Sequence, residues 1–105
     1  MDNYKSGVAF TYGDEVMIRG DVSKGAFEGE FSVVIHTESD LISGFVRDED
    51  MIKVEGAKGY IRAIVRNVTI DTITVRILGS FFTTNGIARL SRDWAKDNVK
   101  RIAAA

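Results

Sequence analysis

The acidic side chains of this sequence come in small groups, and grouped carboxylates are what general acid–base catalysis and divalent cations use. The groups are Asp14–Glu15, Asp48–Asp50, and Asp93 with Asp97. An acid–base pair needs two carboxyl groups that converge in one cleft, whereas acids grouped in turn segments are usually solvated. The run Asp48–Asp50 also lacks the alternating spacing and the glycine of a calcium loop. We therefore expect these acids to hold no metal and to include no catalytic residue.

Other nucleophiles and metal ligands are scarce. The sequence has no cysteine, which excludes disulfides, thiolate zinc sites, iron–sulfur clusters and a cysteine nucleophile. His36 is the one histidine, and no G-x-S-x-G motif supplies a serine for a catalytic triad. Neither a P-loop nor a G-x-G-x-x-G motif is present. The sequence thus predicts a protein that is not an enzyme and needs no cofactor. It also predicts that His36 lies on the surface near Glu38 and Asp40.

Positive charge is concentrated in the second half of the chain. Residues 1–56 contain 12 acids and 5 bases, a net charge of −7, and residues 57–105 contain 3 acids and 9 bases, a net charge of +6. Such an asymmetry indicates a basic surface that meets an anion, often nucleic acid. It also fits attraction between the two halves, or between one half and a second subunit. The residues expected to contact phosphate groups are Arg62, Arg66, Arg76, Arg89, Arg92, Lys100 and Arg101.

Phe81 and Phe82 are adjacent in a segment with glycine at both ends, 79–86. Neighbouring side chains of an extended chain point to opposite sides, so one ring can cover the core while the other stays exposed. An exposed loop aromatic is a typical anchor for a protein partner or a stacked base. We expect Phe81, Phe82 and Tyr60 to bind a partner; the alternative is that both phenylalanines cap the core. Trp94 is expected to pack a short helix onto the barrel.

Alternating apolar and polar residues predict a mainly β fold that positions these side chains. The strand-like runs are 15–22, 30–38, 41–46, 60–68, 72–78 and 86–90, with turns about every ten residues. A turn at residues 70–71 joins the fourth and fifth runs in a hairpin. Ser91 is a good N-cap for a short helix over residues 91–97, and residues 98–102 either continue that helix or return to a strand.

A weak internal repeat divides the chain. The segment 47–53 (RDEDMIK) is echoed by 92–100 (RDWAKDNVK), and each copy follows three strand-like runs. Each copy would then contain three strands, a one-turn helix and a closing strand. We expect residues 1–105 to form a single compact unit with sub-repeats 8–54 and 57–102, built either as separate small barrels or as one shared sheet.

This order of elements resembles the SH3-type small β-barrel superfamily, which includes Tudor and KOW domains. The resemblance covers residues 12–54, where a G-D-x-V opening at 13–16 precedes a glycine-bearing loop at 24–29 and an apolar strand at 31–35; a looser echo covers 59–102. Ser32 departs from the KOW pattern, which has glycine before the residue corresponding to Val33. The resemblance implies a binding module rather than an enzyme.

Three functions remain open. The first is a small non-enzymatic binding module that contacts a protein partner, such as an accessory or inhibitory protein of a phage or mobile element. The second is nucleic-acid binding through the basic half. The third is a self-assembling structural protein, a homo-oligomer in which an acidic half meets a basic half. No run approaches the ~20 apolar residues of a membrane span, and no N-terminal signal pattern is present, so we expect a soluble, cytoplasmic protein without a membrane partner.

Overall fold

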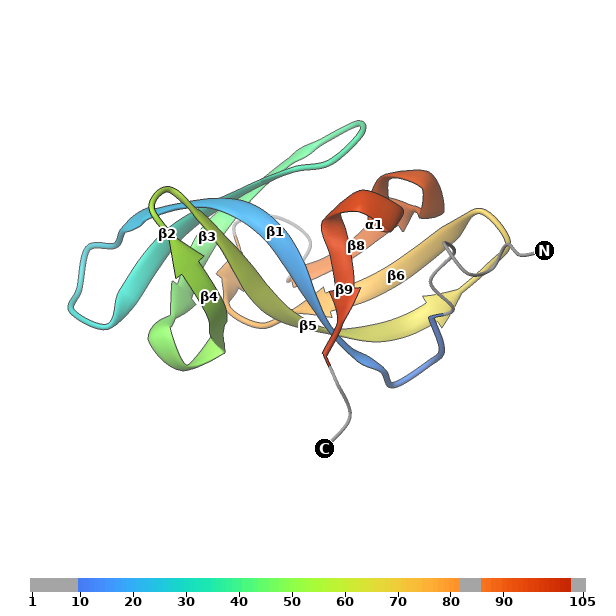
Figure 1. Ribbon diagram of the computed structural model, residues 1–105, viewed down its shortest axis with the longest axis horizontal. Coiled ribbons are helices and arrows are strands. Elements are labelled where there is room, and N and C mark those ends of the chain that lie inside the picture. The colour runs from blue at the N-terminus through green and yellow to red at the C-terminus, as the bar shows by residue number, and fades with distance from the viewer. Residues whose placement is uncertain (1–9, 82–85, 103–105) are drawn as a thin grey trace.

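The computed structural model describes residues 10–81 and 86–102, which are mainly β with one short α-helix near the C-terminus, as predicted (Figure 1). The strands are β1 (Glu15–Lys24), β2 (Glu30–His36), β3 (Leu41–Arg47), β4 (Met51–Glu55), β5 (Lys58–Val68), β6 (Thr72–Ile77), β7 (Ser80–Phe81), β8 (Ile87–Ser91) and β9 (Val99–Arg101). The helices are a 3₁₀ turn, η2 (Asp48–Asp50), and α1 (Arg92–Asn98). The six predicted runs are all strands, with ends shifted by one or two residues.

The strands form one antiparallel sheet that curls into a half-barrel (Figure 1). Its main path runs β7-β3-β2-β1-β5-β6-β8, and β4 and β9 lie off this path, beside β5 and β1. The two longest strands, β1 and β5, pair from Glu15 opposite Ile64 to Asp21 opposite Lys58. The predicted hairpin of β5 and β6 is confirmed, with a bulge between Val65 and Asn67. The curl gives the sheet a buried inner face and an exposed outer face.

The last strand of each half of the chain pairs with the first strand of the other half. β4 pairs with the start of β5, and β9 pairs with residues Val16–Ile18 of β1. β1 and β5 are therefore each shared by both halves, which makes the fold one continuous sheet. Both halves run through three strands, a short helix and a closing strand, with the two-residue β7 added in the second half. Their division into sub-repeats 8–54 and 57–102 stays a prediction.

The inner face of the sheet carries an apolar core, in which no buried polar side chain occurs within the described residues. Ile61, Ala63 and Val65, predicted to share a face of their strand, are fully buried, and so are Ile73 and Val75 on β6. Burying one Val or Ile side chain stabilises the fold by about 1.5–3 kcal/mol. Because strand side chains alternate between the two faces, the polar residues between these positions point outward, and they build the surfaces described below.

Helix α1 begins and ends for local reasons. The Ser91 side chain accepts a hydrogen bond from the Trp94 backbone N–H at 3.0 Å, as expected of an N-cap. The backbone turns extended at Val99, whose buried side chain opens β9, so the chain returns to a strand there. Trp94 packs against the core, as predicted. No helix within residues 10–81 and 86–102 has the length and apolar character to cross a bilayer.

Candidate functional site

The turn between β1 and β2 presents a phenyl ring to solvent. The Gly25 backbone N–H donates to the Glu30 carbonyl at 2.9 Å, and the Glu30 N–H donates to the Phe27 carbonyl at 3.2 Å. Gly29 takes a left-handed φ of 78°, which glycine adopts without steric cost. The turn therefore holds Phe27 at its tip with 73 % of its surface exposed. This ring matters for binding only together with the side chains around it, because single exposed apolar residues are common on protein surfaces.

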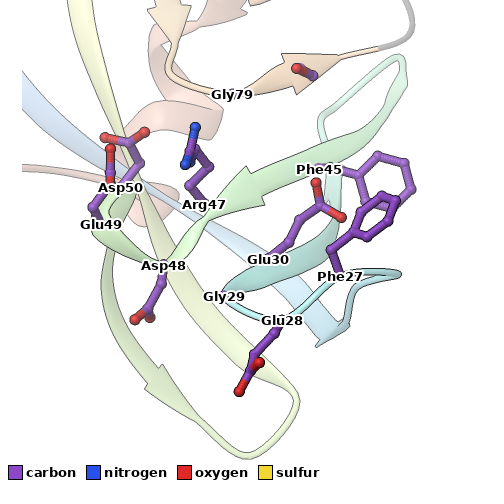
Figure 2. Close-up of a pocket in the computed structure, with 11 residues that line it drawn as sticks. Phe27, Glu28, Gly29, Glu30, Phe45, Arg47, Asp48, Glu49, Asp50 and Gly79 are labelled. Atoms are coloured by element: carbon purple, nitrogen blue, oxygen red, sulfur yellow. The ribbon is translucent and has the colours of Figure 1, made fainter.

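A groove of about 620 Å³ opens beside this turn (Figure 2). We call it the acidic groove; it is lined by Phe27, Glu28, Gly29, Glu30, Phe45, Arg47, Asp48, Glu49, Asp50, Gly79 and Ser80. The β2–β3 register places Glu30 opposite Arg47 and Ser32 opposite Phe45 on the outer face of the sheet. Figure 2 shows the rings of Phe27 and Phe45 on the same side of the groove, with the Glu30 carboxylate near them.

Backbone hydrogen bonds and strand pairing fix the walls of the acidic groove. The Asp48 N–H donates to the Gly29 carbonyl at 2.8 Å, which ties η2 to the β1–β2 turn. On the other side, β7 pairs with β3 through Gly44 opposite Phe81 and Phe45 opposite Ser80. Gly79 and Ser80, which come from the second half of the chain, are thereby held against strands of the first half. The groove consequently depends on both halves of the sheet.

Negative charge dominates the acidic groove. Five carboxylates line it, and Arg47 is the single cation among its lining residues. No ion pair within residues 10–81 and 86–102 neutralises any of the five. Nor do three acidic or histidine side chains converge on one point anywhere in the described part of the chain, as a metal ion would require. The carboxylates are dispersed along the groove, an arrangement that suits an extended ligand with several positive charges.

Two of the three partner-binding residues predicted from the sequence, Phe81 and Tyr60, lie outside the acidic groove. Phe81 is partly buried and packs against the core from β7. Phe82 lies outside the described residues. The ring of Tyr60 is half-buried, and the Lys100 ammonium lies 5.2 Å from its centroid, a cation–π distance. Neither Phe81 nor Tyr60 lines the acidic groove.

The predicted basic residues separate into two groups. Four make contacts within the chain. Two form ion pairs, Arg62 with Glu15 at 2.9 Å and Arg101 with Asp14 at 3.4 Å. The other two are Arg92, which donates to the Thr69 carbonyl at 3.0 Å, and Lys100, which lies over the Tyr60 ring. The other three are exposed on the outer face of β5, β6 and β8, and within the described residues their side chains have no ion pair or hydrogen bond. We call these three, Arg66, Arg76 and Arg89, the arginine face.

His36 is on the surface, as predicted, but its neighbour is Asp21 on β1 rather than Glu38 or Asp40. His36 Nε2 lies 3.1 Å from Asp21 Oδ2, and Lys58 of β5 contacts the other Asp21 oxygen. The hydrogen bond from Lys58 lowers the pKa of Asp21, and the His36 charge acts in the same direction. Asp14 also has a lowered pKa, chiefly because its carboxylate accepts the Thr11 backbone N–H.

The sequence analysis noted the loop that carries Phe27 but assigned it no role. Glycine at 25 and 29 on either side of an aromatic residue, with acids at 28 and 30, was the available signal. Comparisons of the chain with protein-family models, with curated proteins and with solved structures find no match.

Proposed function

We propose that this chain is a non-enzymatic binding module of the SH3-type small-barrel kind, whose acidic groove binds a basic segment of a protein partner. The observation that supports the proposal is the exposed Phe27 ring beside five carboxylates that have no ion-pair partner in the described residues. A Lys or Arg side chain can lay its methylene stem on the ring while its charged head reaches a carboxylate. The dispersed acids favour a peptide with two or more cations over a single ion.

The geometry favours this protein-binding proposal over nucleic-acid binding. The acidic groove is a concave surface, and it carries an exposed aromatic side chain of the kind that anchors protein interfaces. Of the seven basic residues that the nucleic-acid alternative needs, four are already engaged within the chain. Three arginines with no partner in the described residues offer few phosphate contacts, and affinity for nucleic acid grows with the number of those contacts.

A peptide titration tests the proposal. We would measure fluorescence anisotropy of a labelled peptide that alternates Arg and Lys with Gly, at ~50 and ~200 mM salt. Binding should weaken as salt rises, because the groove carboxylates are at the surface. Phe27→Ala should weaken binding about tenfold, the effect of losing one anchor residue. Glu30→Gln should weaken it several-fold, since it removes a charge and keeps the shape.

Matched controls make the result specific. Ile70→Ala removes an apolar side chain that is 87 % exposed and lies outside the acidic groove, and Glu38→Gln removes an exposed acid elsewhere. Both should leave peptide affinity unchanged. Failure of the wild-type protein to bind the peptide at ~50 mM salt would refute the proposal. Equal affinity of wild type and the Phe27→Ala, Glu30→Gln double variant would refute it as well.

A further inference from the structure

We infer that the basic partner of the acidic groove is the arginine face of a second copy of this chain. The inference rests on the proposed function, because it names the partner of that same groove. It starts from the arginine face, whose three guanidinium groups have no counter-charge within the described residues. Guanidinium groups present a planar set of donors that matches a carboxylate, so they suit the carboxylates of the groove.

The strand register groups these arginines on one surface. Ile64 on β5, Arg76 on β6 and Ile87 on β8 lie in one row across the three strands. Arg89 is opposite Thr74 in the next row, and Arg66 lies at the β5 bulge beside it. Ile87 is 38 % exposed among the arginines. The arginine face therefore combines isoleucine side chains with cations, and the acidic groove combines aromatic rings with anions.

The structure does not bring these two surfaces into contact within one copy. The acidic groove lies on the outer face of β2 and β3, and the arginine face lies on the outer face of β5, β6 and β8, on the other side of β1 in the strand order. Arg89 lines a separate hollow with Asp40 and Leu41, where β3 begins. No ion pair connects the acidic groove to the arginine face within the part of the chain that the structure describes. Each surface is therefore open to a second molecule.

The local charges of the two surfaces support this partner. The acidic groove carries five carboxylates and one cation among its lining residues, and the arginine face carries three guanidinium groups. The contact joins two different surfaces and leaves a free groove at one end of the assembly and a free arginine face at the other. Association of this type continues to longer chains unless it closes into a ring. It should be strongest at low salt, because both surfaces are exposed.

Sedimentation velocity of the full chain tests the inference. Over ~5–500 µM protein, the average mass should rise with concentration at ~50 mM salt, and association should weaken about tenfold or more at ~500 mM. Two variants separate the surfaces: Arg66→Glu with Arg76→Glu alters only the arginine face, and Glu30→Arg with Asp48→Arg alters only the acidic groove. Each variant alone should be monomeric. Mixed together they should associate again, since each keeps the surface that the other needs.

Lys96→Glu and Glu38→Arg, exposed charges outside both surfaces, are controls and should associate like wild type. A wild-type monomer at ~500 µM and ~50 mM salt overturns the inference. If the basic peptide still binds that monomer, the proposed function stands; if it does not, both fail. Binding of labelled mixed-sequence DNA that is lost with Arg66→Glu, by a chain that stays monomeric, would also overturn the inference. It would assign the arginine face to nucleic acid.

Discussion

Replacing Gly44 with alanine should detach one wall of the acidic groove. Gly44 lies on the inner face of β3, directly opposite Phe81 of β7. A Cβ atom added there would lie 2.3 Å from the Ser80 carbonyl oxygen and 2.7 Å from the Phe81 Cα. Both are backbone atoms, so no side-chain rotation can relieve the contact. β7 must move away from β3, which breaks their pairing and withdraws Phe81 from the core.

The expected cost is about 1–3 kcal/mol of unfolding free energy, the usual penalty for adding volume to a packed site. Each kcal/mol should lower the melting temperature by about 4–8 °C for a domain near this size. Urea unfolding followed by the fluorescence of Trp94, the single tryptophan, would measure the loss. Hydrogen exchange should show faster exchange at residues 79–81, and affinity for the basic peptide should fall because Gly79 and Ser80 line the groove.

Ser43→Ala is the matched control, since it alters the neighbouring residue on the outer face of β3 and should change stability by no more than about 0.5 kcal/mol. The reasoning would be refuted by a Gly44→Ala protein that matches wild type in stability and keeps slow exchange at residues 79–81. Loss of stability spread over the whole sheet, with β7 still protected, would also contradict it.

Two further predictions concern acid and the helix. The lowered pKa values of Asp14 and Asp21 mean that both stabilise the fold at neutral pH, and that this stabilisation is lost as the pH falls through the ordinary value of 3.8 and below. Urea unfolding of wild type and of the Asp14→Asn, Asp21→Asn variant should show a smaller acid-induced loss in the variant; parallel pH profiles would contradict this. Ser91→Ala removes the N-cap of α1 and should cost about 1 kcal/mol, whereas Ser91→Asp should retain most of the stability; equal stability of Ser91→Ala and wild type would show that the cap contributes nothing.

The positions of the strands could be predicted because the alternation of apolar and polar residues that marks a strand lies within the strand itself. Alternation at Ile61, Ala63 and Val65 marks a buried face whichever strands lie alongside, and Ser91 caps whichever helix follows it. The pairing was not predictable in the same way. Nothing in the sequence of β4 or β9 says that each continues onto the first strand of the other half, because that choice depends on the curl of the whole sheet. β7 is too short to give a periodic signal.

The candidate site was harder to predict than the fold for a related reason. The sequence pointed to Phe81, Phe82 and Tyr60 as partner-binding residues, with capping of the core as the alternative for the two phenylalanines. Phe81 packs against the core, and Phe27, to which no role was assigned, is exposed. From residue type alone, Phe27 and Phe81 are equally good candidates for an anchor residue. Only burial separates them, and burial depends on where the fold places each ring: Phe81 on β7 and Phe27 on the turn between β1 and β2.

The pairing of β4 with β5 and of β9 with β1 links the two halves, and this link decides which substitutions can separate binding from folding. The acidic groove and the arginine face are built from outward-facing side chains, while the β1–β5 pair that holds their strands in place is built from inward-facing ones. A Cβ at Gly59 would lie 2.9 Å from the Lys53 carbonyl oxygen and from side chains of Met51 and Val22, so a substitution there disturbs β1, β4 and β5 together. Such a change weakens both surfaces through the shared core. Phe27 and Arg76, which are exposed, test one surface each and leave that core intact.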